Sequence, residues 1–217
     1  GRLNSILAAR SIRAVVFTGL WKPDVVERMD LSELACATIG HVIRKPALSR
    51  AASDKFSNTV YLCQRLWSMG YRRIALVIPE VQEIRVEDTF LGGYLTFHFR
   101  HRHEGWAEPL SFESEWDEPA VFDWLQTMRP DAVIAAYPGL GRYMRARLKE
   151  KAPYVALVNP FGDSPSPGIA QRHDLVAAAA VDLVDGQLGR NELGVPEAPV
   201  VQLIRGTWVE GEPDETA

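Results

Sequence analysis

Short apolar runs alternate with longer stretches of mixed polar and apolar residues along this chain. Such alternation is typical of α/β units, in which each strand is followed by a helix that packs back on the sheet. Several runs are apolar at every position, as expected of parallel strands that helices cover on both faces. The sequence therefore predicts an α/β fold with parallel sheets. The predicted strands are Ala14–Phe17, Ala35–Ile39, Ile74–Ile78, Leu110–Phe112, Ala132–Ala136, Tyr154–Val158 and Val200–Ile204.

The stretches between these runs carry helical spacing. Within Asn58–Met69, Val60, Cys63 and Trp67 fall at i, i+3 and i+7, and Gly70 follows as a C-terminal cap. Further helices are predicted over Leu3–Arg10, Glu118–Met128, Arg142–Lys151 and Leu175–Leu188.

The first predicted helix, Leu3–Arg10, leads directly into the strand Ala14–Phe17 with no strand before it. An α/β lobe that starts on a helix indicates that its first strand is missing. Such a lobe exposes a sheet edge and apolar surface, so we expect aggregation or non-native pairing of this chain.

Composition narrows the class of protein. Of the 217 residues, 47% are hydrophobic and 24% are charged, as in ordinary globular proteins. The formal net charge of -4 argues against DNA contacts by these residues, because neutralising phosphates requires a basic surface. No apolar run approaches the roughly 18 residues of a membrane span, and the first residues do not resemble a signal peptide. A cytoplasmic protein is expected.

Cys36 and Cys63 lie among apolar neighbours and without metal-type spacing. This placement favours buried free thiols in a reducing compartment, with a disulfide as the alternative.

Five phrases of the sequence, in this order and spacing, resemble one family. The phrases are Arg10–Phe17, Gly70–Val77, Arg129–Ala135, Gly168–Gln171 followed by Ala177–Leu183, and Ile204–Gly211. They resemble the effector-binding core of the LacI/GalR (lactose and galactose repressor) transcription regulators. The resemblance implies two Rossmann-like lobes of the type I periplasmic-binding-protein kind, a ligand in the cleft between them, and a homodimer. The family's helix-turn-helix headpiece and first strands lie outside this sequence, which implies an incomplete N-terminal lobe and contact with operator DNA only through that headpiece.

By the same resemblance, three crossovers between the lobes fall near Asp54, Gln171 and Val195. The N-terminal lobe would then comprise residues 1–54 and 173–194. The C-terminal lobe would comprise residues 55–171 and 196–217.

The resemblance also implies ligand-binding positions. Asp54 stands where the family places an aspartate that hydrogen-bonds the ligand, but it directly precedes a predicted helix and could equally be its N-cap. Gln171 matches a crossover glutamine, and Asn159 lies near the expected place of a pocket aspartate. The alternative for these two side chains is hydrogen bonding within loops.

One departure from the family pattern concerns an arginine expected three residues before the pair Gly93-Tyr94. Phe90 occupies that position and is therefore a candidate ligand contact, although a core residue is favoured because Phe90, Tyr94 and Phe97 share one helical face. Arg85 or the carboxylate of Asp88 could replace the arginine as a ligand contact, although solvent exposure is favoured for Arg85.

A second departure lies after the strand Ala132–Ala136, where the usual pocket aspartate corresponds to Pro138. The neighbouring Tyr137 either stacks on a sugar or base or caps the lobe. Because two side chains typical of sugar binding are replaced, a standard monosaccharide effector is doubtful, and the pocket takes an unusual ligand or none.

The sequence gives little indication of a metal site or of a phosphate-binding loop. For His98, His101 and His103 an exposed basic helix end is favoured over a metal site, because arginines separate the histidines. The segment Gly139–Gly141 lacks the further glycine of a dinucleotide fingerprint and the lysine of a phosphate loop. We therefore predict no enzyme, no cofactor and no metal.

The sequence thus predicts the ligand-sensing and dimerising core of a LacI-type regulator, with a small molecule such as a carbohydrate as effector. An exported solute-binding protein of the same fold is the alternative, and it would be a monomer. An α/β enzyme is the third hypothesis, which requires a phosphate-binding glycine loop that the sequence does not show.

Overall fold

The chain folds into two compact units. Unit 1 comprises Gly1–Ser53 and Arg172–Ile204, and unit 2 comprises Asp54–Gln171 and Arg205–Ala217. The structure is a computed structural model that describes residues 2–19, 24–101, 107–112, 117–137, 139–160 and 166–211.

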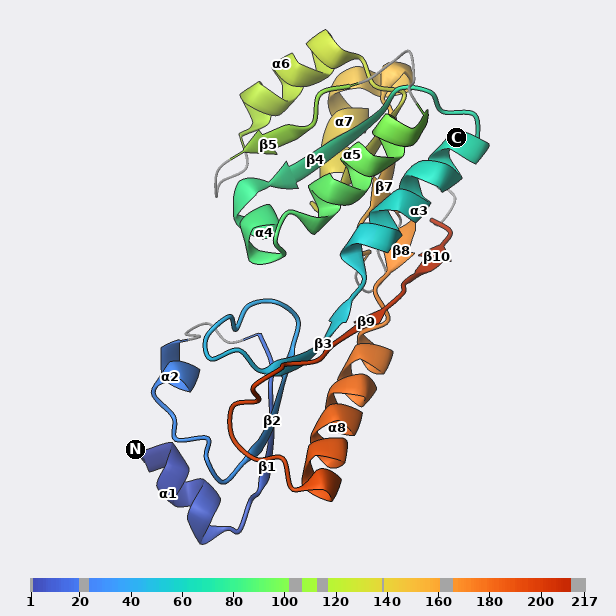
Figure 1. The fold of residues 1–217 in the computed structure, drawn as a ribbon. Coiled ribbons are helices and arrows are strands. Elements are labelled where there is room, and N and C mark those ends of the chain that lie inside the picture. The colour runs from blue at the N-terminus through green and yellow to red at the C-terminus, as the bar shows by residue number, and fades with distance from the viewer. Residues whose placement is uncertain are drawn as a thin grey trace. The chain divides into compact units, whose positions relative to one another are not determined.

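Helices and strands alternate through most of the chain, as Figure 1 shows. The helices are α1 (Arg2–Ala9), α2 (Asp24–Glu27), α3 (Lys55–Ser68), α4 (Glu80–Arg85), α5 (Thr89–His101), α6 (Glu118–Met128), α7 (Leu140–Leu148), the 3-10 turn η1 (Lys149–Lys151) and α8 (His173–Arg190). The strands are β1 (Ala14–Phe17), β2 (Ala35–Ile39), β3 (Ser49–Ser53), β4 (Ile74–Pro79), β5 (Leu110–Phe112), β6 (Ala132–Ala135), β7 (Tyr154–Leu157), β8 (Gly168–Ala170), β9 (Val201–Ile204) and β10 (Thr207–Val209).

Unit 1 is built on a four-stranded parallel sheet in the order β1-β2-β3-β9. Successive side chains of a strand point to opposite faces. Accordingly, Val15 and Phe17 join one core cluster with Val26, whereas Val16 joins another with Val176 of α8. Helix α8 therefore covers one face, and loops with α1 and α2 cover the other.

A side chain of α8 also completes the hydrogen bonding of β2. The amide oxygen of Gln187 accepts from the Cys36 N–H at 2.8 Å, and its Nε2 donates to the Cys36 carbonyl at 3.1 Å. Strand β3 pairs with β2 only from Ala37 onward, so Gln187 takes the place of a strand there. Without it, each buried backbone group would cost about 1–3 kcal/mol.

Unit 2 is built on a six-stranded sheet in the order β10-β8-β7-β6-β4-β5, parallel except for β10. Its strand residues alternate between two core clusters. Ile74, Leu76 and Ile78 of β4 pack with α3 and α5, whereas Ala75 and Val77 pack with α6 and α7. Two helices therefore cover each face of this sheet, which explains the continuously apolar strands.

An aspartate joins the loops that lead into β4 and β6. The two carboxylate oxygens of Asp131 accept from the Arg72 and Arg73 N–H groups at 2.7 and 2.9 Å. These residues belong to two of the phrases on which the resemblance rests, and the bonds help to set the start of the neighbouring strands.

The structure corrects several sequence predictions about strands and crossovers. Strands β3, β8 and β10 are present in the structure but were not predicted. The sequence of β3, Ser49–Ser53, is not an apolar run and therefore does not indicate a strand. The third crossover follows Ile204 and does not lie near Val195, because β9 pairs with β3 of unit 1.

Two helix predictions also need correction. Helix α3 begins at Lys55, before the predicted start at Asn58, and ends at Ser68 with Met69 as its C-cap. The prediction that His98 lies at an exposed basic helix end is wrong. His98 is buried, and the centroid of its ring lies 4.4 Å from that of Tyr94. His101 stacks on Phe97, and His103 lies outside the described residues.

Both cysteines are buried free thiols, as predicted. Burial raises the pKa of the Cys36 thiol to about 11 and also raises that of Cys63. In the ranges that the structure describes, none of the helices combines the length and apolar character needed to cross a bilayer.

Candidate functional site

The carboxyl edge of the six-stranded sheet in unit 2 gathers polar side chains. Because β4, β6, β7 and β8 run parallel, the residues that follow them lie along one edge. Strand β10 is antiparallel to β8 and starts beside Ala170, so Arg205 enters at the same edge. The residues brought there include Tyr137, Asn159, Gln171 and Arg205.

Asp54 is the N-cap of α3, where its Oδ1 accepts from the Ser57 N–H at 3.0 Å. Its Oδ2 lies 4.0 Å from Nε of Arg205, and the Asp54 side chain is only 14% exposed. The N-cap interpretation is therefore realised in the structure. The second oxygen faces a guanidinium group, so ligand binding by Asp54 stays a prediction that capping does not contradict.

Arg205 was missed as a site residue by the sequence analysis. Its side chain is 82% exposed, and its ion pair with Asp54 is long, so solvent screens most of that interaction. The signal was available, since Arg205 directly follows the predicted strand that ends at Ile204.

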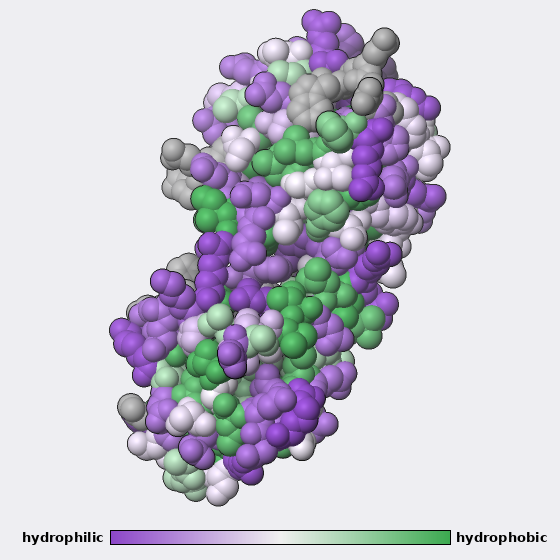
Figure 2. Space-filling model, in the orientation of Figure 1, coloured by the Kyte–Doolittle hydropathy of each residue, from purple (hydrophilic) through white to green (hydrophobic). Residues whose placement is uncertain are grey.

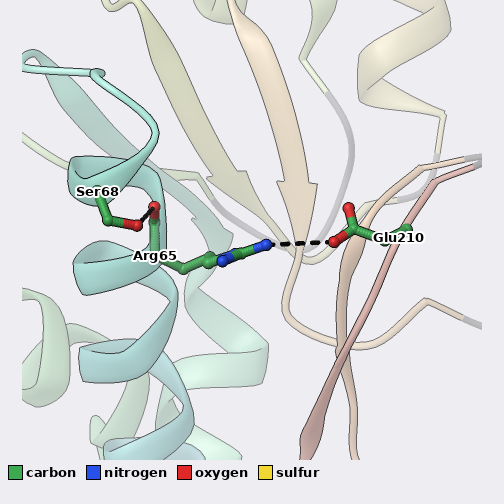
Figure 3. A network of polar contacts seen from close by, with 3 residues as sticks. All are labelled: Arg65, Ser68 and Glu210. Atoms are coloured by element: carbon green, nitrogen blue, oxygen red, sulfur yellow. Dashed lines mark hydrogen bonds and ion pairs between the residues drawn. The ribbon is translucent and has the colours of Figure 1, made fainter.

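Two contacts hold the chain around Arg205 against α3. The Gly206 N–H donates to Oδ1 of Asn58 at 2.9 Å. Farther along, Arg65 reaches from α3 to Glu210 with Nη2–Oε1 at 3.2 Å, while Ser68 Oγ donates to the Arg65 carbonyl (Figure 3). These contacts fix where the chain re-enters unit 2.

Gln171 is buried, and its Nε2 donates to the Val158 carbonyl at 3.0 Å. This bond ties the end of β8 to the end of β7, which is the loop-type hydrogen bonding given above as the alternative. Asn159 follows Val158 and is half-buried. Ligand binding by Gln171 and Asn159 remains a prediction.

The other predicted ligand residues differ in exposure. Phe90 is 4% exposed in the core beside Tyr94, so it is a packing residue and not a ligand contact. Arg85 is exposed at the end of α4. Tyr137 is 45% exposed, and its ring lies so close to Gly139 that an added Cβ would come within 2.6 Å. Pro138 lies outside the described residues.

Glu83 is a buried carboxyl group of α4 that the sequence analysis did not single out. Its Oε1 accepts from the Leu91 N–H at 3.0 Å, and its Oε2 has no hydrogen-bond partner within the described part of the chain. Burial is the main cause that raises the pKa of Glu83 to about 7. Nothing in the sequence distinguishes Glu83 from the exposed Glu80 and Glu87, because only packing buries it.

The side chains at this edge can bind a ligand through hydrogen bonds. A carboxylate, a guanidinium group and carboxamides can accept and donate hydrogen bonds to hydroxyl or acid groups of a ligand. Among the residues that the structure describes, no group of three or more His, Cys, Asp or Glu side chains comes together to hold a metal ion.

Comparisons with known proteins bear on this arrangement. No family model and no curated protein matches the sequence. The transcriptional regulator CelR in its cellobiose complex aligns with a TM-score of 0.66 at 18% identity, covering 97% of this chain and 68% of that chain. The fold is that of the LacI-type regulators.

Two further LacI-type structures share the fold. The Cra transcriptional dual regulator from Pseudomonas putida, in complex with fructose 1-phosphate, aligns with a TM-score of 0.65 at 17% identity, covering 97% of this chain and 82% of that chain. A periplasmic binding protein/LacI transcriptional regulator from Alkaliphilus metalliredigens, complexed with D-xylulofuranose, aligns with a TM-score of 0.64 at 16% identity, covering 97% of this chain and 81% of that chain. The predicted α/β fold of the periplasmic-binding-protein type is confirmed.

Proposed function

We propose that this chain is the effector-sensing core of a LacI-type transcription regulator and has no enzymatic activity. The observation that carries the proposal is the LacI-type fold over 97% of the chain, shared with regulators solved with cellobiose or fructose 1-phosphate. Function does not follow from fold alone, so the proposal also rests on the polar carboxyl edge of unit 2. That edge provides acceptors and donors of the kind that bind hydroxylated ligands.

We propose Asp54, Asn159, Gln171 and Tyr137 as effector contacts, with Arg205 added from the structure. Phe90 is excluded because it lies in the core. Asp54 would accept hydroxyl groups through Oδ2, the oxygen not engaged with Ser57. Arg205 would pair with an acid group, which favours a sugar derivative over a neutral monosaccharide.

The regulatory part of the proposal follows from the coupling between effector binding and the conformation of the protein. An effector that binds one arrangement of the protein better than another shifts the population toward it. In a cytoplasmic homodimer, this shift would change how two helix-turn-helix headpieces, outside these 217 residues, meet a palindromic operator.

The test is thermal unfolding of the chain with sugars, sugar acids, oligosaccharides and purines. An effector at a hundred times its dissociation constant should add about 2.7 kcal/mol of stability. The shift should be lost in Asp54→Ser, which retains an N-cap oxygen but loses the carboxylate. Asp117→Ser is the matched control, since Asp117 caps α6 by the same type of bond to Ala120 at 3.0 Å.

Two results would count against the proposal. A flat response to the whole panel would indicate that this edge holds no effector of these classes. An equal loss of the shift in Asp54→Ser and Asp117→Ser would show that the carboxylate of Asp54 acts only through helix capping.

A further inference from the structure

A surface pocket of about 470 Å³ lies along α3. Phe56, Tyr61 and Gln64 of α3 line it, together with Arg100 near the end of α5 and Arg205 beside the third crossover. All the lining residues belong to unit 2, so the pocket is formed within that unit.

The charge of this pocket is opposite to that of the chain. Arg100 and Arg205 give it two positive charges, and its described lining contains no Asp or Glu, although the chain carries a net charge of -4. Arg205 is 82% exposed and only distantly paired. Guanidinium groups bind phosphate and carboxylate through charge-assisted hydrogen bonds. The pocket therefore favours an anion.

The same pocket also presents aromatic rings. Phe56 and Tyr61 are 40% and 44% exposed, so their rings are accessible to a ligand. Both lie on α3, whose buried face is formed by other residues such as Leu62 and Leu66. An exposed ring supplies a flat surface on which a sugar ring or a base can pack.

We propose that this pocket is a second ligand site, which binds a ring-bearing phosphomonoester. A phosphomonoester carries a charge of about -1.5 to -2 at neutral pH, which matches the two arginines. Its ring would pack against Phe56 and Tyr61, and the Gln64 carboxamide is placed to hydrogen-bond ring substituents. The site is separate in its residues from the carboxyl edge except at Arg205.

The probe for this site is phenyl phosphate, titrated into the chain by calorimetry. It should bind saturably and about tenfold more tightly than inorganic phosphate, because its ring buries apolar surface. Arg100→Gln should weaken binding at least about fivefold, as expected from the loss of a charge-assisted hydrogen bond at an exposed position. Tyr61→Ala should reduce the preference for phenyl phosphate over inorganic phosphate.

Matched controls separate this site from the rest of the molecule. Arg142→Gln removes an exposed arginine from α7, outside the pocket, and should leave the affinity unchanged. Arg100 lines the pocket but is not among the proposed effector contacts, so the result for Arg100→Gln reports on this pocket and not on the proposed effector site.

Glucose 6-phosphate and adenosine monophosphate then distinguish a sugar ring from a base, and tighter binding of either one by the pocket assigns the ring class. Two results would overturn the proposal. The first is the absence of saturable phenyl phosphate binding. The second is an equal affinity in the Arg100→Gln and Arg142→Gln variants.

Discussion

Glu83 brings a carboxyl group into the core next to the first turn of α5. It accepts a hydrogen bond from the Leu91 N–H, and hydrogen bonding to the backbone of Leu91 and Phe90 favours the charged form. Burial and the nearby Asp88 carboxylate act in the opposite direction, and burial is the largest cause. The net result is a pKa raised from 4.5 to about 7.

The raised pKa of Glu83 makes stability depend on pH. Between the unfolded pKa of 4.5 and the folded pKa of about 7, the folded chain binds more protons than the unfolded chain. The contribution of Glu83 to stability is therefore fully present below pH 4.5 and is lost as the pH rises from 4.5 through 7, by on the order of 1–3 kcal/mol. In Glu83→Gln this loss should disappear, so the variant should gain stability relative to the parent between pH 5 and pH 8.

Urea unfolding at both pH values measures this difference. Glu87→Gln is the control, since Glu87 is exposed in the same part of the chain and should show little pH-dependent gain. If the stability difference between Glu83→Gln and the parent does not change with pH, Glu83 does not titrate in this range.

At the scale of elements, the contact between α3 and α5 depends on a glycine. A Cβ added at Gly93 would lie 2.6 Å from the Phe56 carbonyl oxygen and 2.9 Å from Cβ of Thr59. The neighbouring Gly92 has more room, since its nearest contact would be Cδ2 of Phe56 at 3.6 Å. The packing of α3 against α5 therefore requires a glycine at position 93 but not at position 92.

This difference predicts opposite effects of one substitution. Gly93→Ala should destabilise the chain by about 1–3 kcal/mol, because α3 and α5 must move apart. Gly92→Ala should be neutral or stabilise by up to about 1 kcal/mol, because alanine favours the helix. Chemical denaturation of the two variants measures both effects, and similar effects of both would show that the helices do not pack closely at Gly93.

At the scale of the whole molecule, apolar side chains reach the surface. Figure 2 shows green hydrophobic patches among the purple hydrophilic surface on the face in view. In unit 1, Val201 and Leu203 are 52% and 50% exposed on β9, which ends one side of the four-stranded sheet. An edge strand with exposed apolar side chains is a template for pairing between molecules.

We therefore expect aggregation of this chain to depend on β9. Leu203→Lys should lower aggregation in light scattering at rising protein concentration, because lysine on an edge strand opposes pairing. Val181→Lys on α8 is the control, since Val181 is 57% exposed but its helix offers no strand edge. Equal reduction by both variants would assign the aggregation to general hydrophobicity, and an unaggregated parent would contradict the expectation altogether.

Local sequence determined the α/β character of this protein and most of its elements. The runs at β1, β2, β4, β6 and β7 are apolar because helices, or in unit 1 helices and loops, cover both faces of the sheets, so the pattern is visible without the fold. Asp54 before a helix and the apolar neighbours of both cysteines were similarly readable, because capping and burial leave local signatures.

Tertiary structure decided what depends on partners distant in the chain. Strand β3 forms because Ala51 packs beneath Val176 and Ala179 of α8, a contact that no local pattern at Ser49–Ser53 reveals. The third crossover lies at Arg205, and not near Val195 as predicted, because β9 pairs with β3. The burial of Glu83 and the approach of Arg205 to Asp54 likewise arise only when separate segments meet, since exposure and proximity are properties of the packed molecule rather than of a window of sequence.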